Sequence, residues 1–337
     1  MASGAAAADP GRAGRQRPRP RHAHRRRPGR PGRRRGRPAD GGRAGPARHD
    51  GRRDAARRPL DLEVAVTSRT DTIRPEPARA YRDTFAPSDP AAPGLLPPGW
   101  HKLYFLPLPA LDELRPDGTP GADGVTPDIA LPRRLYAGEE LTFHRPIRFG
   151  ETLELTTTLG EVREKTGGSG PLVFVTLEST IRSGAEVVTS IRQRDVFLGD
   201  APPGSAPRPV AGPAGDEWAW AGELTITPVH LFRFSALTFN SHRIHYDRDW
   251  VRDVEGQPDL IVHGPLLELL LLDFCVRNVP DRPVARFSMR AVAPAYVDTP
   301  IRLAGIPHDG GAQVWALDDK GDVLSTGEAV WAAPDAD

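Results

Sequence analysis

The chain has 337 residues and a net charge of +1, which is long enough for two ordinary domains with a sizeable core. No run of apolar residues reaches the roughly 18 needed to cross a bilayer, so we expect no membrane span. The one cysteine, Cys275, cannot form an internal disulfide. This suits a reducing compartment, and we expect a cytoplasmic protein.

Residues 1–58 differ from the rest of the chain in charge and composition. They hold 19 arginines and four aspartates, a net charge of +15, which leaves −14 for the remainder. Arg, Gly, Ala and Pro dominate, so this segment cannot bury enough surface to offset its ordering entropy, and we predict a disordered basic tail. Three interpretations stay open: a translation-start artefact or inert tail, a targeting segment, and a polyanion-binding arm. No aromatic residues interleave the arginines, which argues against nucleic acid as a partner.

A first set of predicted elements occupies residues 60–199. Residues 76–85 predict a short helix with a proline in its first turn, and the aromatic stretch 96–105 should pack on a core. Residues 115–132 are rich in Pro, Gly and Asp and predict a long loop. Alternation of β-branched with polar residues then predicts strands, separated by turns, at residues 140–158, 172–181 and 186–197.

A second half follows at residues 223–337, after a stretch rich in Pro, Gly and Ala at 200–222 that predicts a linker. In this half, residues 234–247 predict a loop. The run 266–272 is apolar on nearly every face and predicts a buried helix that starts at Gly264. Strands are predicted again, after this helix, at residues 285–290, 293–303, 312–317 and 323–331.

The two halves share the same order of predicted elements, in which a Pro-containing segment is followed by a long strand, a tight turn and a final strand. This indicates a weak internal duplication of one α+β unit. Short turns join successive strands, so we predict an antiparallel sheet with one long helix packed on it.

The start of the buried helix is a candidate binding site. Gly264 and Pro265 stand there, and a proline at the first position costs no hydrogen-bond donor. The first amides of a helix lack intrahelical partners and carry partial positive charge. In the interior they need an acceptor, and a thioester carbonyl oxygen would serve, as would a side chain or a water.

The segment before this helix carries a candidate acid–base pair. Asn240 could hold a water while His245, whose imidazole has a pKa near neutral, removes its proton. We expect Asp247 to fix the loop, orient a ring nitrogen or cap the following turn. His263 could line the site, and His242 is expected at the surface. A lone histidine is more often structural than catalytic, so the residues alone leave this role open.

Other site classes find no support in the sequence. The histidines have no companion ligands at zinc-like spacing, so we predict no metal. A Gly-x-Ser-x-Gly elbow, a phosphate loop and a dinucleotide fingerprint are all absent from the sequence. We therefore expect no cofactor.

The pattern Asn240, His245 and Asp247, followed by His263 and Gly264, resembles the MaoC-like, hydratase-2 branch of the hot-dog fold. That motif normally has Asp where Asn240 stands. The amino-acid sequence of residues 234–247 resembles that of one sub-branch of this family. The sub-branch contains mesaconyl-C4-CoA hydratase, itaconyl-CoA hydratase and type 2 3-hydroxyacyl-thioester dehydratase. Residues 96–100, 132–134 and 169–174 resemble the first domain of proteins in this sub-branch, which is a fatty-acid-synthase-1-like dehydratase domain. The resemblance covers about residues 60–335.

The resemblance implies an α+β double hot dog, two helix-wrapped antiparallel sheets, with a non-catalytic first half (60–199) and a catalytic second half (223–337). It implies reversible hydration of an α,β-enoyl thioester of CoA or acyl carrier protein, and it allows a homodimer. Asn240 and His245 would hold and activate water, and the Gly264 amide would polarise the thioester carbonyl. A hot-dog thioesterase and a non-catalytic acyl-thioester binder are the alternatives.

The acyl chain of the substrate is not encoded in any motif. The resemblance to this sub-branch favours branched C4–C5 dicarboxyl-CoA thioesters. Four arginines could face a substrate carboxylate, the phosphates of CoA or only solvent, namely Arg133, Arg134, Arg243 and Arg290.

Overall fold

A computed structural model describes residues 66–85, 93–121, 123–167, 170–199 and 209–333. All of them belong to one unit of the chain, which begins at Arg58. The basic tail predicted at 1–58 lies outside the described residues, as do residues 200–208 of the predicted linker. None of the described helices is long and apolar enough to cross a membrane.

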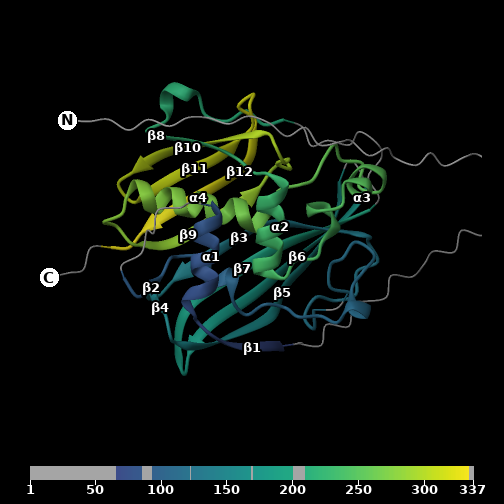
Figure 1. Ribbon diagram of the computed structural model, residues 1–337, viewed down its shortest axis with the longest axis horizontal. Coiled ribbons are helices and arrows are strands. Elements are labelled where there is room, and N and C mark those ends of the chain that lie inside the picture. The colour runs from purple at the N-terminus through teal and green to yellow at the C-terminus, as the bar shows by residue number, and fades with distance from the viewer. Residues whose placement is uncertain (1–65, 86–92, 122, 168–169, 200–208, 334–337) are drawn as a thin grey trace, which may run out of the picture. The chain divides into compact units, whose positions relative to one another are not determined.

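One antiparallel sheet of ten strands organises the described part of the chain (Figure 1). The first half contributes β1 (Val66–Thr72), β3 (Arg133–Phe143), β5 (Thr152–Gly167), β6 (Gly170–Ser183) and β7 (Glu186–Leu198). The second half contributes β8 (Trp220–Thr225), β9 (Val284–Ala291), β10 (Pro300–His308), β11 (Gly311–Leu317) and β12 (Val323–Trp331). A separate pair is formed by β2 (Leu95–Leu96) and β4 (Ile147–Arg148).

Both halves arrange their strands in the same way. The order across the sheet is β1-β5-β6-β7-β3-β9-β12-β11-β10-β8. In each half, the third, fourth and fifth strands along the chain therefore lie between the first and the second. The two second strands, β3 and β9, pair with each other from Gly138 opposite Arg290 to Thr142 opposite Arg286. The internal duplication seen in the sequence thus corresponds to two equivalent half-sheets joined edge to edge.

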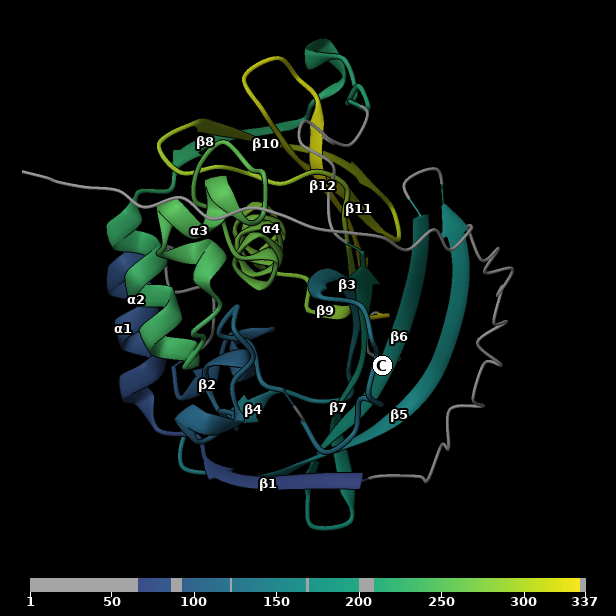
Figure 2. The same ribbon diagram turned by 90° about the vertical axis from the view of Figure 1, so that its right-hand side faces the viewer.

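The helices are distributed unequally over these halves. They are α1 (Pro75–Phe85), α2 (Pro228–Thr238), α3 (Arg248–Asp253) and α4 (Gly264–Asn278). Figure 2 shows α4 on the inner side of the curved sheet, where it packs on β3 and on β9 to β12. By contrast, α1 packs mainly on α2 and on the 3₁₀ turn Trp100–Leu103. The strands of the first half are therefore not filled by a long central helix of their own.

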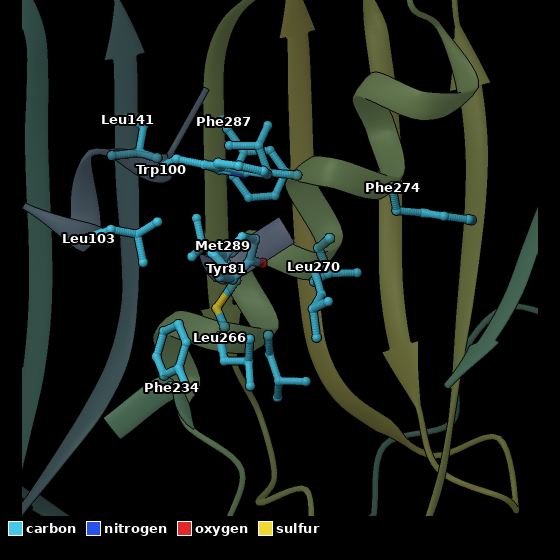
Figure 3. Close-up of a cluster of buried hydrophobic side chains, with 14 of the residues drawn as sticks. Tyr81, Trp100, Leu103, Leu141, Phe234, Leu266, Leu270, Phe274, Phe287 and Met289 are labelled. Atoms are coloured by element: carbon cyan, nitrogen blue, oxygen red, sulfur yellow. The ribbon is translucent and has the colours of Figure 1, made fainter. Parts of the chain in front are cut away.

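The predicted buried helix is confirmed as α4, in which every residue from 266 to 276 is buried. Leu266, Leu270 and Phe274 contribute to a cluster with Phe287 and Met289 of β9 (Figure 3). Complete burial of one such side chain stabilises the fold by roughly 1.5–3 kcal/mol, so this helix supplies much of the core. Its lone cysteine, Cys275, is buried and free.

The carboxyl group of Asp273 lies inside this core. Asp273 of α4 is 1% exposed and accepts hydrogen bonds from Trp100 Nε1 (2.9 Å) and Tyr81 Oη (3.3 Å). Burial raises the pKa of Asp273 to about 7, although both hydrogen bonds oppose the shift. The aromatic stretch predicted to pack on the core does so here, and it fixes the 3₁₀ turn against α4.

The loop predicted over residues 234–247 is wrong in its first part. Residues 234–238 form the last turn of α2, which begins at Pro228. The side chain of Thr227 caps this helix by accepting from His230 N, and a proline at the first position has the φ that a helix requires. This Thr-Pro pair was a readable helix-start signal.

Three strand boundaries also differ from the predictions. Residues 293–299 precede β10 and are not part of a strand, and Asp298 has a φ of +56°, which breaks the extended conformation. Residues 220–222, predicted as linker, belong to β8. The stretch 140–158 is divided among β3, β4 and β5, with breaks next to a proline and a glycine of positive φ.

Candidate active site

A cavity of about 1000 Å³ lies between the two halves. Strands β3, β5, β6 and β7 of the first half line one part of it. The end of α2, the segment 239–245 and the start of α4 line another part. Asn240, His245 and Gly264, which the sequence predicts to form one site, all border this cavity.

The ring of His245 is held in one orientation and one tautomer. This residue is 6% exposed and lies in the 3₁₀ turn Arg243–His245. Its Nδ1 is 2.7 Å from the carbonyl oxygen of Ile261. A carbonyl can only accept, so Nδ1 carries the proton and Nε2 carries the lone pair. His245 can therefore act as a base through Nε2.

A second histidine packs against this ring. His263 is fully buried, and its ring stacks on His245 with centroids 3.5 Å apart and an interplanar angle of 21°. The Nε2 of His263 is 2.9 Å from the hydroxyl of Ser235, on α2. His263 thus packs against the ring of His245 and is not among the residues that border the cavity. No feature of the sequence indicated that Ser235 and Ile261 would orient these two rings.

Burial keeps both rings neutral. It lowers the pKa of His245 to about 3, with a further contribution from nearby His242, whereas the hydrogen bond to Ile261 opposes the shift. Burial also lowers the pKa of His263 well below its ordinary value, with His245 and His242 adding to the shift. At neutral pH the lone pair of His245 is therefore available.

Asn240 is oriented by backbone groups on both sides. It follows Phe239, which ends α2 in the left-handed conformation (φ +51°), and its own N–H donates to Ser235 O (2.9 Å). Its side-chain Oδ1 accepts from the N–H of His242 (2.9 Å). The carboxamide oxygen is thereby occupied, and the –NH₂ group remains as a donor for a ligand.

Gly264 starts α4 without a side-chain cap. Among the described residues, no acceptor for its N–H is found, and the following proline has no N–H. A Cβ at this position would lie 2.5 Å from Cδ1 of Tyr136, so only glycine fits beside that ring. The helix start therefore presents a free N–H to the cavity, as an oxyanion requires.

Asp247 caps a helix and does not contact the imidazole. It accepts from Trp250 N (3.0 Å) at the start of α3 and forms an ion pair with Arg243 (2.7 Å). The capping hydrogen bond, and then Arg243, lower the pKa of its carboxyl. Of the expected roles, the structure supports the cap and the fixing of the loop. The surface position expected for His242 is wrong, because this residue is 9% exposed and borders the cavity.

A loop of the first half holds the segment that carries Asn240 and His245. The N–H of Arg243 donates to Asp117 O (2.7 Å), and the hydroxyl of Ser241 donates to Gly118 O (2.7 Å). These contacts join residues more than 120 positions apart, so no local pattern could have predicted them. The first half, although predicted to be non-catalytic, thus positions the site.

Three of the four arginines considered above are paired with carboxylates. Arg133 pairs with Glu255 (2.7 Å), Arg134 with Asp195 (2.6 Å) and Arg243 with Asp247. Arg290 borders the cavity, is exposed and forms no ion pair with any described residue. It is the arginine whose charge is available to a ligand. No cluster of His, Cys, Asp and Glu suited to a metal ion occurs among the described residues.

Comparisons with known proteins identify the family of this chain. Residues 99–297, more than half of the chain, match the family described as hydroxyacyl-thioester dehydratase type 2. The mesaconyl-C(4)-CoA hydratase of Chloroflexus aurantiacus is 40% identical over 219 residues, which cover 65% of this chain and 78% of that protein. The mitochondrial hydroxyacyl-thioester dehydratase type 2 of Schizosaccharomyces pombe is 25% identical over 236 residues, or 62% and 77% of the two chains.

Solved structures establish the fold. HtdX of Mycobacterium tuberculosis has a TM-score of 0.59 at 19% identity and covers 79% of this chain and 100% of its own. A MaoC-like dehydratase from Phytophthora capsici has a TM-score of 0.56 at 16% identity, with 81% and 97% covered. The fold is therefore the predicted double hot dog. The protein is a hydro-lyase of the thioester hydratase and dehydratase type, and it belongs to the hydroxyacyl-thioester dehydratase type 2 family.

Proposed function

We propose that Asn240, His245 and Gly264 carry the reaction, a reversible addition of water to an α,β-enoyl thioester of CoA or acyl carrier protein, without a cofactor. One observation supports this assignment above all. Asn240, His245 and Gly264 border the same cavity, and no described residue pairs with His245 Nε2, the –NH₂ of Asn240 or the N–H of Gly264. A base, a water-holding donor and an oxyanion-binding amide are the groups that hydration requires.

In the hydration direction, His245 Nε2 removes a proton from water while the water oxygen forms a bond to the β carbon. The electron pair of the double bond moves toward the thioester oxygen, where the N–H of Gly264 stabilises the enolate. His245 then returns its proton to the α carbon, so the sum of the steps is the addition of one water. The –NH₂ of Asn240 donates to the water oxygen and fixes its position.

The cost of charging a buried imidazole suits this sequence of steps. Burial disfavours the imidazolium, so His245 retains the proton only while the enolate is present. The negative charge on the enolate oxygen offsets part of that cost. The proton is therefore returned to carbon rather than released.

For the acyl group we favour branched C4–C5 dicarboxyl thioesters, because the relative at 40% identity is named mesaconyl-C(4)-CoA hydratase. Arg290, exposed and without an ion-pair partner among the described residues, is suited to the phosphates of CoA. A homodimer and a cytoplasmic location stay predictions.

The proposal is tested by incubating the protein with crotonyl-, mesaconyl- and itaconyl-CoA and following a mass increase of one water. We expect His245→Ala to lower turnover by roughly 100- to 10,000-fold, the usual contribution of a general base. His308→Ala, at an exposed position, is the matched control. Normal hydration by a folded His245→Ala variant would remove His245 from the mechanism.

The two alternatives give different results in the same assay. Release of free thiol without hydration would indicate a thioesterase. Tight binding of these thioesters with no change in mass would indicate an acyl-thioester binder. Either result would contradict the proposed reaction.

A further inference from the structure

A group of buried ionisable side chains borders the cavity, and the hydration steps above do not use it. We call this group the polar wall; it consists of His101, Lys102, Tyr136, Glu139 and Glu268. His101, Lys102, Tyr136 and Glu139 line the cavity. The side chains of Lys102, Glu139 and Glu268 are 12%, 3% and 0% exposed. Charged groups are seldom buried to this degree, so their position calls for a function.

Local structure directs these side chains. In the 3₁₀ turn Trp100–Leu103, Trp100 and Leu103 are three residues apart and both enter the core. His101 and Lys102 therefore occupy the other faces of the turn. On β3, the bulge between Tyr136 and Gly138 places Tyr136 and Glu139 close to the same partner, Glu268 of α4.

The polar wall contains one cation for two carboxyl groups. Lys102 Nζ contacts Glu139 and lies 3.4 Å from Glu268, which also accepts from the hydroxyl of Tyr136. Burial opposes the Lys102 cation, but Glu139 and Glu268 outweigh it and raise its pKa. Burial, and next the charge of Glu268, raise the pKa of Glu139 to about 8. Glu139 therefore holds a proton at neutral pH and can donate a hydrogen bond.

Two polar atoms of the wall have no partner among the described residues. They are His101 Nε2 and Glu268 Oε1, in residues that are 5% and 0% exposed. An unsatisfied buried polar group costs roughly 1–3 kcal/mol, and His101 borders the cavity. Both atoms are enclosed by protein, and a carboxylate offers no donor to Glu268 Oε1, so contacts to a ligand in the cavity fall to Lys102 and Glu139.

The polar wall begins one side chain away from the proposed oxyanion site. The ring of Tyr136 lies against Gly264, and its hydroxyl reaches Glu268. Four residues of helix separate these two positions, about 6 Å along the axis. That span suits a short acyl group whose thioester oxygen lies at Gly264 and whose far end meets the wall.

We infer that the polar wall binds a carboxylate on the acyl group of the substrate, through Lys102 Nζ and the Glu139 carboxyl group. This inference rests on the proposed function, since it assigns the acyl end of the same site. It selects short 2-enoyl thioesters that carry a carboxylate near the β carbon, and it disfavours long alkyl chains. Lys102 and the protonated Glu139 provide charge-assisted hydrogen bonds to a carboxylate that an alkyl analogue cannot form.

The first experiment compares substrates with the full chain. Crotonyl-CoA is matched with the thioester in which a carboxylate replaces its methyl group, and a ten-carbon 2-enoyl-CoA is the long-chain probe. We expect kcat/KM for the carboxylate thioester to exceed that for crotonyl-CoA by roughly 100-fold. Equal rates, or a preference for either alkyl thioester, would overturn the inference and the choice of dicarboxyl substrates, and would leave the proposed hydration reaction intact. Hydration of none of the three would contradict the proposed function itself.

The second experiment assigns the preference to residues. In Lys102→Met, the ratio of kcat/KM for carboxylate to methyl thioester should fall at least about tenfold. Lys320→Met, in the exposed turn between β11 and β12, is the matched control and should keep the ratio. An unchanged ratio in a folded Lys102→Met variant would overturn the assignment.

A third measurement serves if Lys102→Met does not fold. Glu139→Gln keeps the shape and the donor of a protonated carboxyl group but cannot ionise. The wild-type preference for the carboxylate thioester should decline above about pH 8, where Glu139 loses its proton, and Glu139→Gln should abolish that decline. The same decline in both proteins would exclude Glu139 from carboxylate binding.

Discussion

Burial of the histidines decides how this site uses protons. Stacking between His245 and His263 would be costly if both rings were charged, and the lowered pKa of each prevents this. His245 differs from its neighbour in having Nε2 free, because its Nδ1 is committed to Ile261. His245 is therefore the ring suited to the proposed base, and His263 fixes its plane.

This protonation state predicts an unusual pH dependence. Because the pKa of His245 is lowered to about 3, its lone pair persists in mildly acidic solution. We expect kcat/KM for hydration to change little between about pH 7.5 and about pH 5. Initial rates across this range, with circular dichroism at each pH to verify folding, provide the measurement. An acid limb near the ordinary histidine pKa of about 6.5 would show that the working base is exposed to solvent.

Substitution of Asn240 separates its two functions. Asn240→Asp keeps an oxygen for the N–H of His242 but loses the –NH₂ donor, and the carboxylate can itself take a proton. We expect kcat to stay within about tenfold of the wild type, whereas Asn240→Ala should lose roughly 100-fold. Steady-state kinetics on crotonyl-CoA test both variants. Complete loss in a folded Asn240→Asp variant would mean that the amide donor is indispensable.

The sequence predicted which residues border the cavity better than it predicted the residues that hold them in place. Asn240, His245 and Gly264 lie within 25 positions of one another, so a local motif could contain them. Ser235 and Ile261 act through tertiary contacts, and the orientation of each ring depends on how α2 meets the segment before α4. Such contacts leave no periodic signal in a single sequence.

Among the secondary-structure elements, those with a strong internal pattern were predicted and those fixed by neighbours were not. The buried helix α4 and strands β6, β7, β11 and β12 follow apolar runs or alternation, and they are confirmed. Helices α2 and α3 depend on caps at Thr227 and Asp247, which the apolar pattern does not reveal. Residues 115–121 were predicted as part of a loop, but the hydrogen bonds from the segment 241–243 to this loop are tertiary contacts that no local pattern predicts.

The contact between the loop at 115–121 and the segment 241–243 predicts the effect of adding one methyl group at Gly118. A Cβ at Gly118 would lie 2.0 Å from Ser241 O, so Gly118→Ala must displace the segment that carries Asn240. Displacement of catalytic groups by about 1 Å can cost roughly 100-fold in rate, and we expect a loss of that order in kcat.

Gly150→Ala is the matched control for this change. Gly150 has a φ of +91°, close to the +84° of Gly118, yet a Cβ there would meet nothing within 4 Å. Both variants carry the same backbone strain, and only the first carries the clash. Melting temperatures and kcat should be measured together. Equal activity in the two variants would show that the loop contact does not position the site.

At the scale of the whole molecule, two equivalent half-sheets have diverged in what they enclose. The second half surrounds α4, and the inner face of the first half borders the cavity instead. The resemblance implied a helix in each half but could not indicate this asymmetry, because α1 has an ordinary helical sequence and its packing on α2 is a tertiary outcome. The space left in the first half is the space that the substrate requires.

Buried ionisable groups of both halves also set the pH at which the whole fold is most stable. The pKa is lowered for His101, His242, His245 and His263. These side chains take up protons more readily in the unfolded chain, so they destabilise the fold as the pH falls below about 6.5. The pKa is raised to about 8 for Glu139 and about 7 for Asp273, so these two destabilise it as the pH rises above about 4.5.

Between about pH 4.5 and about 6.5, unfolding lets four histidines gain a proton and only two carboxyl groups lose one, so the unfolded chain binds more protons than the folded protein. Above about pH 6.5, only the two carboxyl groups differ in protonation between the two states. The free energy of unfolding should therefore be greatest near pH 6.5, with each unbalanced proton worth roughly 1.4 kcal/mol per pH unit. Urea denaturation across this range measures it. Asp273→Asn should flatten the alkaline side of the curve and steepen the acid side, because one of the two carboxyl groups that oppose the histidines is lost. Stability that keeps rising from pH 6.5 to about pH 5 would show that the histidines are charged in the folded protein.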